Sequence, residues 1–215
     1  MTGAVDLALA ADEPVSRRVA DALFPEAEHR FLTRDELRPP APFAGPLFEL
    51  LAAFARPAGG RGEEAPGAIG RPEVVVGLVV PVVWRGAAAS GGSSAPDMLP
   101  SGTLLAVADH VNLEVRGPLT GRWPASVPRS FPPLTGIYQP ADVRARGGPR
   151  VYSSGVVVAG VSDAGRLTPF EARAVREEGI IAVSDCLVPP AIVAAFYGLT
   201  LAACGVPVAD DNDEE

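Results

Sequence analysis

The feature that most limits the possible folds is the segment 74–83, in which every residue except one glycine and one proline is valine or leucine. A strand with one face in water alternates apolar and polar residues, whereas a continuous apolar run suits a strand buried on both faces. The run is also too short to cross a bilayer, as are the other apolar runs of the chain. It therefore predicts a central strand of a covered sheet in a protein without a membrane span.

Shorter apolar runs alternate with segments of helical periodicity along the rest of the chain. Strands are expected at 4–9, 103–108, 156–159, 180–183 and 199–204, and helices at 15–24, 48–54, 168–178 and 189–197. Segments 57–72 and 116–149 are rich in Gly or Pro and are expected to be irregular. This alternation predicts an α/β domain with a mixed or largely parallel sheet.

The charge distribution predicts one domain and a tail. The net charge is −8, and five of the 26 acidic residues lie among the last six positions. We expect a single domain over 1–208 and a disordered acidic tail over 209–215. All 18 basic residues are arginine, and they form no basic stripe, so nucleic-acid binding is not expected.

The cysteines and histidines do not predict a metal site. Cys186 and Cys204 lie in apolar segments, and no Cys/His group has metal-ligand spacing, so we expect no metal and no cofactor. The N-terminus lacks a basic region of the secretory type. These features favour reduced thiols and a cytoplasmic protein.

Several motifs together resemble the trimeric purine nucleoside phosphorylase and methylthioadenosine phosphorylase family. Segment 101–113 is similar to that family's apolar strand followed by Asp-His-Ile-Asn-Leu, and Pro118-Leu119 matches its Asn-Pro-Leu. Phe131-Pro132 with Tyr138, segment 159–173 and segment 179–198 follow in the family's order. The matches cover roughly half of the chain, and as a set they are more specific than any one motif.

The resemblance implies a three-layer α/β sandwich with a mixed, mostly parallel central sheet. It also implies ribosyl transfer on a purine or related nucleoside, in which phosphate attacks the anomeric carbon and the base leaves. The family's glycine-rich phosphate loop is replaced here by residues 11–14, Ala-Asp-Glu-Pro, and its Arg-x-His hairpin has no counterpart. Phosphate-binding residues therefore stay unassigned.

Substrate contacts are carried over from the family at four positions. Ala88 and Ala89 match a turn after the central strand, and Asp163 stands closest to the family's purine-binding Glu. Phe131 matches a residue that covers the ribose of a neighbouring subunit. The resemblance thus implies a small-molecule nucleoside or base as ligand, bound by these four residues.

Asp185 is the candidate catalytic residue. It follows the apolar segment 180–183, and ligand sites of α/β sheets gather at the carboxyl ends of strands. Its carboxylate suits the binding of ribose hydroxyls or the activation of water. The alternative is a cap for the helix expected from Pro189. Asp12 and Glu13 belong either to the same cleft or to a solvated turn.

The remaining reactive side chains favour structural roles. His110 follows an apolar strand and has no paired nucleophile, and His29 lies in a charged segment typical of a surface. Asp185 beside Cys186 raises the pKa of a thiol rather than activating it, and Cys204 is expected in the core.

Three function classes stay open: a ribosyl-transferring enzyme, a non-catalytic subunit beside an active homologue, and a nucleoside hydrolase or biosynthetic relative that uses water. Trp123, Phe131 and Ile137 lie on a segment without a predicted helix or strand, and exposed aromatic residues favour docking. The phosphorylase family that the chain resembles uses the matching segment at a threefold interface, so the resemblance implies a homotrimer, or a mixed trimer with a homologous chain.

Overall fold

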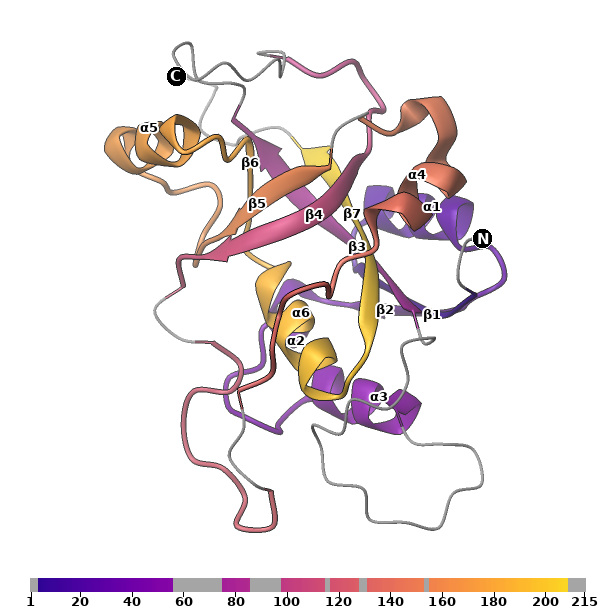
Figure 1. The fold of residues 1–215 in the computed structure, drawn as a ribbon, viewed down its shortest axis with the longest axis vertical. Helices are drawn as coiled ribbons and strands as arrows, with labels where there is room; N and C mark the ends of the chain where they lie inside the picture. Colours follow the sequence, from indigo (N-terminus) through magenta and orange to yellow (C-terminus); the bar gives the residue numbers. More distant parts are fainter. Residues whose placement is uncertain are drawn as a thin grey trace.

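The computed structural model describes residues 4–55, 75–85, 98–114, 117–127, 131–152 and 155–208. Within these ranges seven strands alternate with six helices (Figure 1). The strands are β1 Val5–Ala11, β2 Glu28–Leu32, β3 Val75–Trp84, β4 Leu105–Asn112, β5 Val156–Gly160, β6 Ala182–Ser184 and β7 Thr200–Val208. The helices are α1 Pro14–Leu23, α2 Arg34–Leu37, α3 Pro46–Ala55, α4 Pro140–Gly147, α5 Pro169–Glu177 and α6 Val188–Phe196. A single 3₁₀ turn, Gly148–Arg150, follows α4.

The strands form one mixed sheet that closes on itself. Its order is β2-β1-β3-β6-β5-β4-β7, and β7 also pairs with β3, so that β3, β6, β5, β4 and β7 form a ring from which β1 and β2 extend. Only the β3–β6 and β4–β7 pairings are antiparallel within the described sheet. The α/β class and the mixed, mostly parallel sheet are confirmed. A three-layer sandwich is not confirmed, because β7 hydrogen-bonds along both of its edges and thereby closes the ring.

Strand β3 is the centre of the sheet, as the apolar run predicts. All of its side chains are buried except Trp84, which is partly exposed. Along the neighbouring β1, successive residues point to opposite faces, so Leu7 and Leu9 join one core cluster while Ala8 and Ala10 join another. Helices α3 and α6 contribute to the first cluster, and α1 and α4 to the second. The sheet is therefore covered on both faces.

The predicted strands and helices are confirmed with small changes of boundary, and three elements were missed. β2 is a half-exposed edge strand with a mostly polar sequence, and α2 is a single turn. α4 lies within the segment predicted to be irregular. Each is too short or too polar to show a clear apolar period. The loop expected at 57–72 and the tail expected at 209–215 lie outside the described residues.

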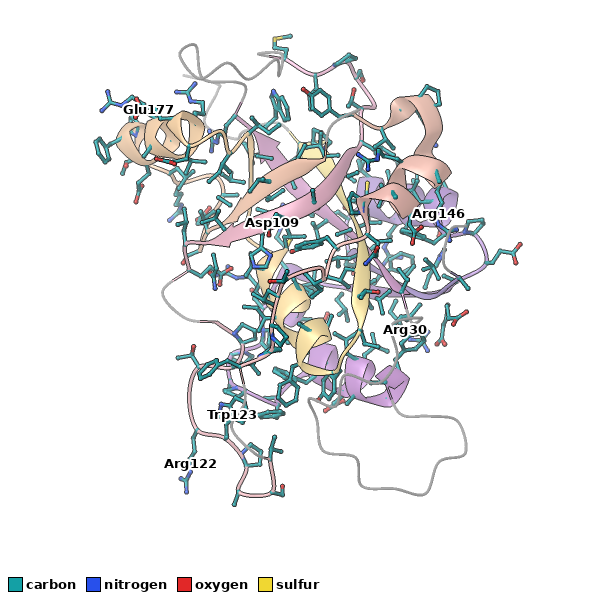
Figure 2. All side chains as sticks on the ribbon, in the orientation of Figure 1. Arg30, Asp109, Arg122, Trp123, Arg146 and Glu177 are labelled. Atoms are coloured by element: carbon teal, nitrogen blue, oxygen red, sulfur yellow. The ribbon has the colours of Figure 1, made fainter. Side chains whose placement is uncertain are left out.

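Segment 117–139 packs more of its apolar side chains than the sequence suggested. Trp123 contacts Phe43 and Phe196, with ring centroids 5.1 and 5.8 Å apart, and its Nε1 donates a hydrogen bond to the carbonyl of Leu119. In Figure 2 the side chain of Arg122 points outward, whereas Trp123 lies against the body of the protein. Ile137 is buried. The expectation that these aromatic and aliphatic residues are all exposed is therefore wrong for Trp123 and Ile137.

His110 has a structural partner. Its Nδ1 lies 2.7 Å from the hydroxyl of Tyr138, a contact that ties β4 to segment 131–139. Burial lowers the pKa of His110, and the charge of Asp109 only partly opposes this. Burial also raises the pKa of Tyr138, so both rings stay neutral near pH 7.

None of the described helices has the length and the apolar character that a membrane span requires.

The contact between Gly160 and Val188 sets the distance between the end of β5 and the start of α6. A Cβ at Gly160 would lie 2.3 Å from Cγ2 of Val188. We expect Gly160→Ala to lower the free energy of unfolding by about 1–3 kcal/mol through overpacking. Urea unfolding measures this, with Gly117→Ala as the control, because a Cβ there meets nothing closer than 3.7 Å.

Val188→Ala in the same chain removes the clashing methyl groups, so the double variant should unfold with a smaller loss than the sum of the two single losses. Strict additivity of the two losses would contradict this packing account.

Candidate functional site

The candidate site lies where β1 and β6 end beside each other on one edge of β3. β1 pairs with β3 in parallel up to Val79, and β6 comes from the opposite end and pairs antiparallel at Val83 and Trp84. Between the two pairings lies Pro81, whose carbonyl accepts a hydrogen bond from the Ser184 hydroxyl at 2.9 Å. Proline has no N–H, so β3 offers no backbone donor to this edge at Pro81. The carboxyl ends of β1 and β6 therefore face each other across this position.

Five charged side chains gather around this junction, and we call them the carboxylate–arginine cluster. Glu13, Glu114 and Asp185 follow β1, β4 and β6, Arg34 is the first residue of α2, and Arg38 directly follows α2. Hydrogen bonds or electrostatic interactions connect all five. Of these five residues, the sequence analysis proposed only Glu13 and Asp185 for such a cleft, together with Asp12, which lies outside the cluster.

Arg34 links the two strand ends. Its Nε donates to Oε1 of Glu13 at 2.9 Å, and Nη1 of the same guanidinium group donates to Oδ2 of Asp185 at 3.2 Å. Burial acts to lower the pKa of Arg34, but the hydrogen bond to Glu13 and the charges of Asp185 and Glu13 outweigh it, and the pKa is raised. Arg34 therefore stays a cation and holds both carboxylates in place.

Asp185 does not cap the following helix. The residue at the N-cap of α6 is Leu187, which has a helical backbone and makes no side-chain cap hydrogen bond. The carboxylate of Asp185, with only 12% of its side chain exposed, is paired with Arg34 instead. Ser184 fixes this turn, since its hydroxyl also accepts a hydrogen bond from the N–H of Cys186. The capping alternative is thus wrong.

Glu114 is the acid of the cluster with the most unusual environment. Burial raises its pKa, the positive charge of Arg38 opposes this, and the negative charge of Asp185 adds to the rise. Its Oε1 atom is buried and has no hydrogen-bond partner in the described part of the chain. A carboxyl group of this kind takes up a proton more readily than an ordinary glutamate and is able to donate it.

Two adjoining pockets open beside Glu114. One, of about 530 Å³, is bounded by Asp35 of α2, by Arg38 directly after α2, and by Pro189 at the start of α6. The other, of about 360 Å³, is bounded by Phe131, Leu134 and Ile192. Both are lined by Glu114 and by residues of the 117–120 turn. The pair offers a polar wall and an apolar wall within the size range of small-molecule sites.

The other residues singled out in the sequence lie in different surroundings. Phe131 lines the second pocket and is 85% exposed. Asp163 is exposed and pairs with Arg166 in the turn before α5. Asp12 pairs with Arg17 rather than with the cluster. Ala88 and Ala89 lie outside the described residues.

The loop after β1 has no donors for an anion. The N–H of Asp12 donates to the carbonyl of Leu32, and the N–H of Glu13 donates to the carbonyl of Ala11, both at 2.7 Å. Pro14 has no N–H. The backbone that would cradle a phosphate is therefore already hydrogen-bonded within the protein, beside two carboxylates.

The thiols are not reactive in this structure. Cys186 and Cys204 are free and fully buried. Burial raises the pKa of Cys186, and it raises the pKa of Cys204 to about 12. Both therefore stay as thiols at neutral pH. In the described ranges no three His, Cys, Asp or Glu side chains are grouped so as to hold a metal ion.

Known proteins resemble this chain in structure rather than in sequence. No family model matches the sequence, and no curated protein sequence matches it significantly. The structure of purine nucleoside phosphorylase from Schistosoma mansoni in complex with adenosine is similar with a TM-score of 0.50 at 16% identity, over 66% of this chain and 51% of that chain. The inosine complex of the same enzyme has a TM-score of 0.49 at 17% identity, over 66% of this chain and 50% of that chain.

The fold resemblance to purine nucleoside phosphorylases that the motifs suggested is thus confirmed. This chain spans about half the length of the enzyme that it resembles. At such low identity the similarity concerns the fold alone.

Removing Arg34 should leave Glu13 and Asp185 without a counter-charge. We expect Arg34→Gln to lower the free energy of unfolding by about 1–2 kcal/mol. The loss is smaller than for a fully buried ion pair, because Arg34 is half-exposed and water screens its charge. The matched control is Arg30→Gln, since Arg30 pairs with Glu28 on the exposed β2. Equal losses for the two variants in urea unfolding would contradict a central role of Arg34.

Proposed function

We propose that this protein transfers the ribosyl group of a purine or related nucleoside, with the base bound in the two pockets beside Glu114. The observation that supports this most is the Glu114 carboxyl group, which has a raised pKa, an unpartnered oxygen and access to both pockets. The fold similarity to a purine nucleoside phosphorylase supports the same substrate class.

Glu114 and Asp185 suit the two proton transfers of such a reaction. As the C1′–N bond breaks, its electron pair stays on the base nitrogen, which takes the proton of the Glu114 carboxyl group. The acceptor oxygen forms the new bond to C1′, and its proton passes to Asp185. Arg34 positions Asp185 for this step, because its guanidinium group holds Oδ2.

Water is the acceptor that we propose. A phosphate acceptor would need free donors near C1′, and the N–H groups of Asp12 and Glu13 are used within the protein. Water needs only a carboxylate that accepts its proton. The products would then be the free base and the free sugar.

The remaining site residues belong to the same proposal. Asp163, Ala88 and Ala89 would contact the nucleoside, as the family resemblance implies. Phe131, which is highly exposed, would cover the ribose of a neighbouring copy in a homotrimer or mixed trimer. The family resemblance is also the support for that assembly.

A second candidate function is that of a non-catalytic subunit beside an active homologue. The pairing of Arg34 with both Glu13 and Asp185 favours it, because these carboxylates are occupied. Ligand binding without turnover, together with assembly with an active chain, would distinguish this function from catalysis.

The activity test uses inosine and adenosine in phosphate-free buffer, with chromatography of the released base. The wild-type protein should release base without phosphate. Glu114→Gln should lower the rate by about 10²–10⁴-fold, because the acid is lost. Glu49→Gln is the control and should keep the full rate, because Glu49 is an exposed residue of α3. The proposal fails if no base is released, or if release requires phosphate.

The raised pKa of Glu114 also gives a prediction for stability. A carboxyl group with a higher pKa in the folded state contributes stability that is present below its ordinary pKa of 4.5 and is lost as pH rises through the folded value. Gln does not ionise. The unfolding free energy of Glu114→Gln relative to wild type should therefore increase from below pH 4.5 to neutral pH, as measured by urea unfolding. A difference that is constant with pH would show that the pKa is not raised.

A further inference from the structure

A third hollow lies apart from the carboxylate–arginine cluster. It has a volume of about 570 Å³ and is bounded by α1, by residues 99–104, by Arg150 and by the end of β7. We call it the α1–β7 groove. None of the described residues that line it also lines either pocket beside Glu114.

The lining of this groove is apolar except for two arginines and two hydroxyl groups. Val15, Val19, Leu99 and Val206 are among its apolar residues. Val15 is 42% exposed, so part of this apolar surface is in contact with water. Among the residues that the structure describes, no acidic side chain lines the groove.

Arg18 and Arg150 are the charged residues of the groove, and both are exposed. Neither forms an ion pair with any residue in the described ranges. The adjacent Arg17, by contrast, pairs with Asp12. In a protein with a net charge of −8, two neighbouring arginines without carboxylate partners leave a local positive charge.

The groove is held in place by backbone hydrogen bonds. The N–H of Leu104 donates to the carbonyl of Arg150, and the N–H of Tyr152 donates to the carbonyl of Leu104, both at 2.8 Å. The hydroxyl of Thr103 donates to the carbonyl of Pro100 at 2.7 Å. Arg150 is thus tied to the 99–104 wall, and the groove is preformed for a ligand.

The strongly acidic segment of the chain begins at the edge of the same groove. Val208, the last residue of β7, lines the groove, and residues 209–215 follow it as Ala-Asp-Asp-Asn-Asp-Glu-Glu. Seven extended residues reach about 23 Å, whereas the ten residues of α1 span about 15 Å. The segment is therefore longer than the α1 wall of the groove, on which Arg18 lies.

We propose that the α1–β7 groove binds the acidic segment 209–215 of its own chain, with its carboxylates paired to Arg18 and Arg150. Attachment next to the groove gives the segment an effective concentration in the millimolar range, so weak ion pairs suffice. The groove is thereby an intramolecular docking site for an acidic peptide, independent of the proposed ribosyl-transfer site.

The test places a nitroxide spin label in the segment. In an Asn212→Cys variant of the full chain only the new cysteine reacts, because Cys186 and Cys204 are fully buried. If the segment docks, NMR of an isotope-labelled sample should show strong paramagnetic relaxation enhancement at the amide protons of Ser101, Gly102 and Thr103.

The effect of charge on the relaxation enhancement distinguishes docking in the groove from an undocked segment that is near the groove only because it is attached there. Arg18→Gln with Arg150→Gln should lower the ratio of docked to undocked segment about fivefold, since two exposed ion pairs are lost. Salt at about 0.5 M should have a similar effect through screening. Arg144→Gln is the matched control and should change nothing, because Arg144 is an exposed residue of α4 that does not line the groove.

Two results would overturn the proposal. One is an enhancement at the groove that neither the double arginine variant nor salt reduces. The other is an enhancement that appears when spin-labelled chains are mixed with isotope-labelled chains without a label, because the segment of a second copy would then occupy the groove. Loss of nucleoside turnover in the variants of Glu114 bears only on the proposed function and leaves this result unchanged.

Discussion

The hydrogen bonding of β3 is the constraint on which the rest of the structure depends. One edge of β3 pairs with β7 along nearly its whole length, from Val75 to Val83. The other edge is divided between β1 and β6, which approach from opposite ends and stop on either side of Pro81. Because these strand ends face each other, a single arginine, Arg34, is able to reach Glu13 from one and Asp185 from the other. The candidate site is thus a consequence of how the sheet is paired.

The sequence predicted most of the fold because the buried strands are continuous apolar runs and the long helices have a clear period. It did not predict ring closure, since the pairing of β7 with both β3 and β4 depends on contacts between distant segments. For the candidate site, Asp185 was proposed from its position after a strand. Arg34 and Arg38 were missed because the short β2 and α2 were missed. Glu114 directly follows the motif Asp-His-Val-Asn-Leu, but its half-buried environment depends on the tertiary structure.

The electrostatics of the site favour proton transfer over anion binding. Three of the five residues in the cluster are acids, and the backbone N–H groups of Asp12 and Glu13 are already bonded. Burial raises the pKa of Glu114, whereas Arg34 holds Asp185 in an ion pair. Two carboxyl groups in such different environments are what acid and base roles in one reaction require. The positive charge of the α1–β7 groove lies apart from this site, so the two regions suit ligands of different charge.

The central claim is that a nucleoside binds with its base beside Glu114. A crystal structure of the Asp185→Asn variant with bound inosine tests it most directly, since the variant should bind the nucleoside without consuming it. The account predicts electron density for the base in the two adjoining pockets, with a ring or exocyclic atom within hydrogen-bond distance of Oε1 of Glu114. Density for the base elsewhere in the protein, with Glu114 free of contact, would contradict the account.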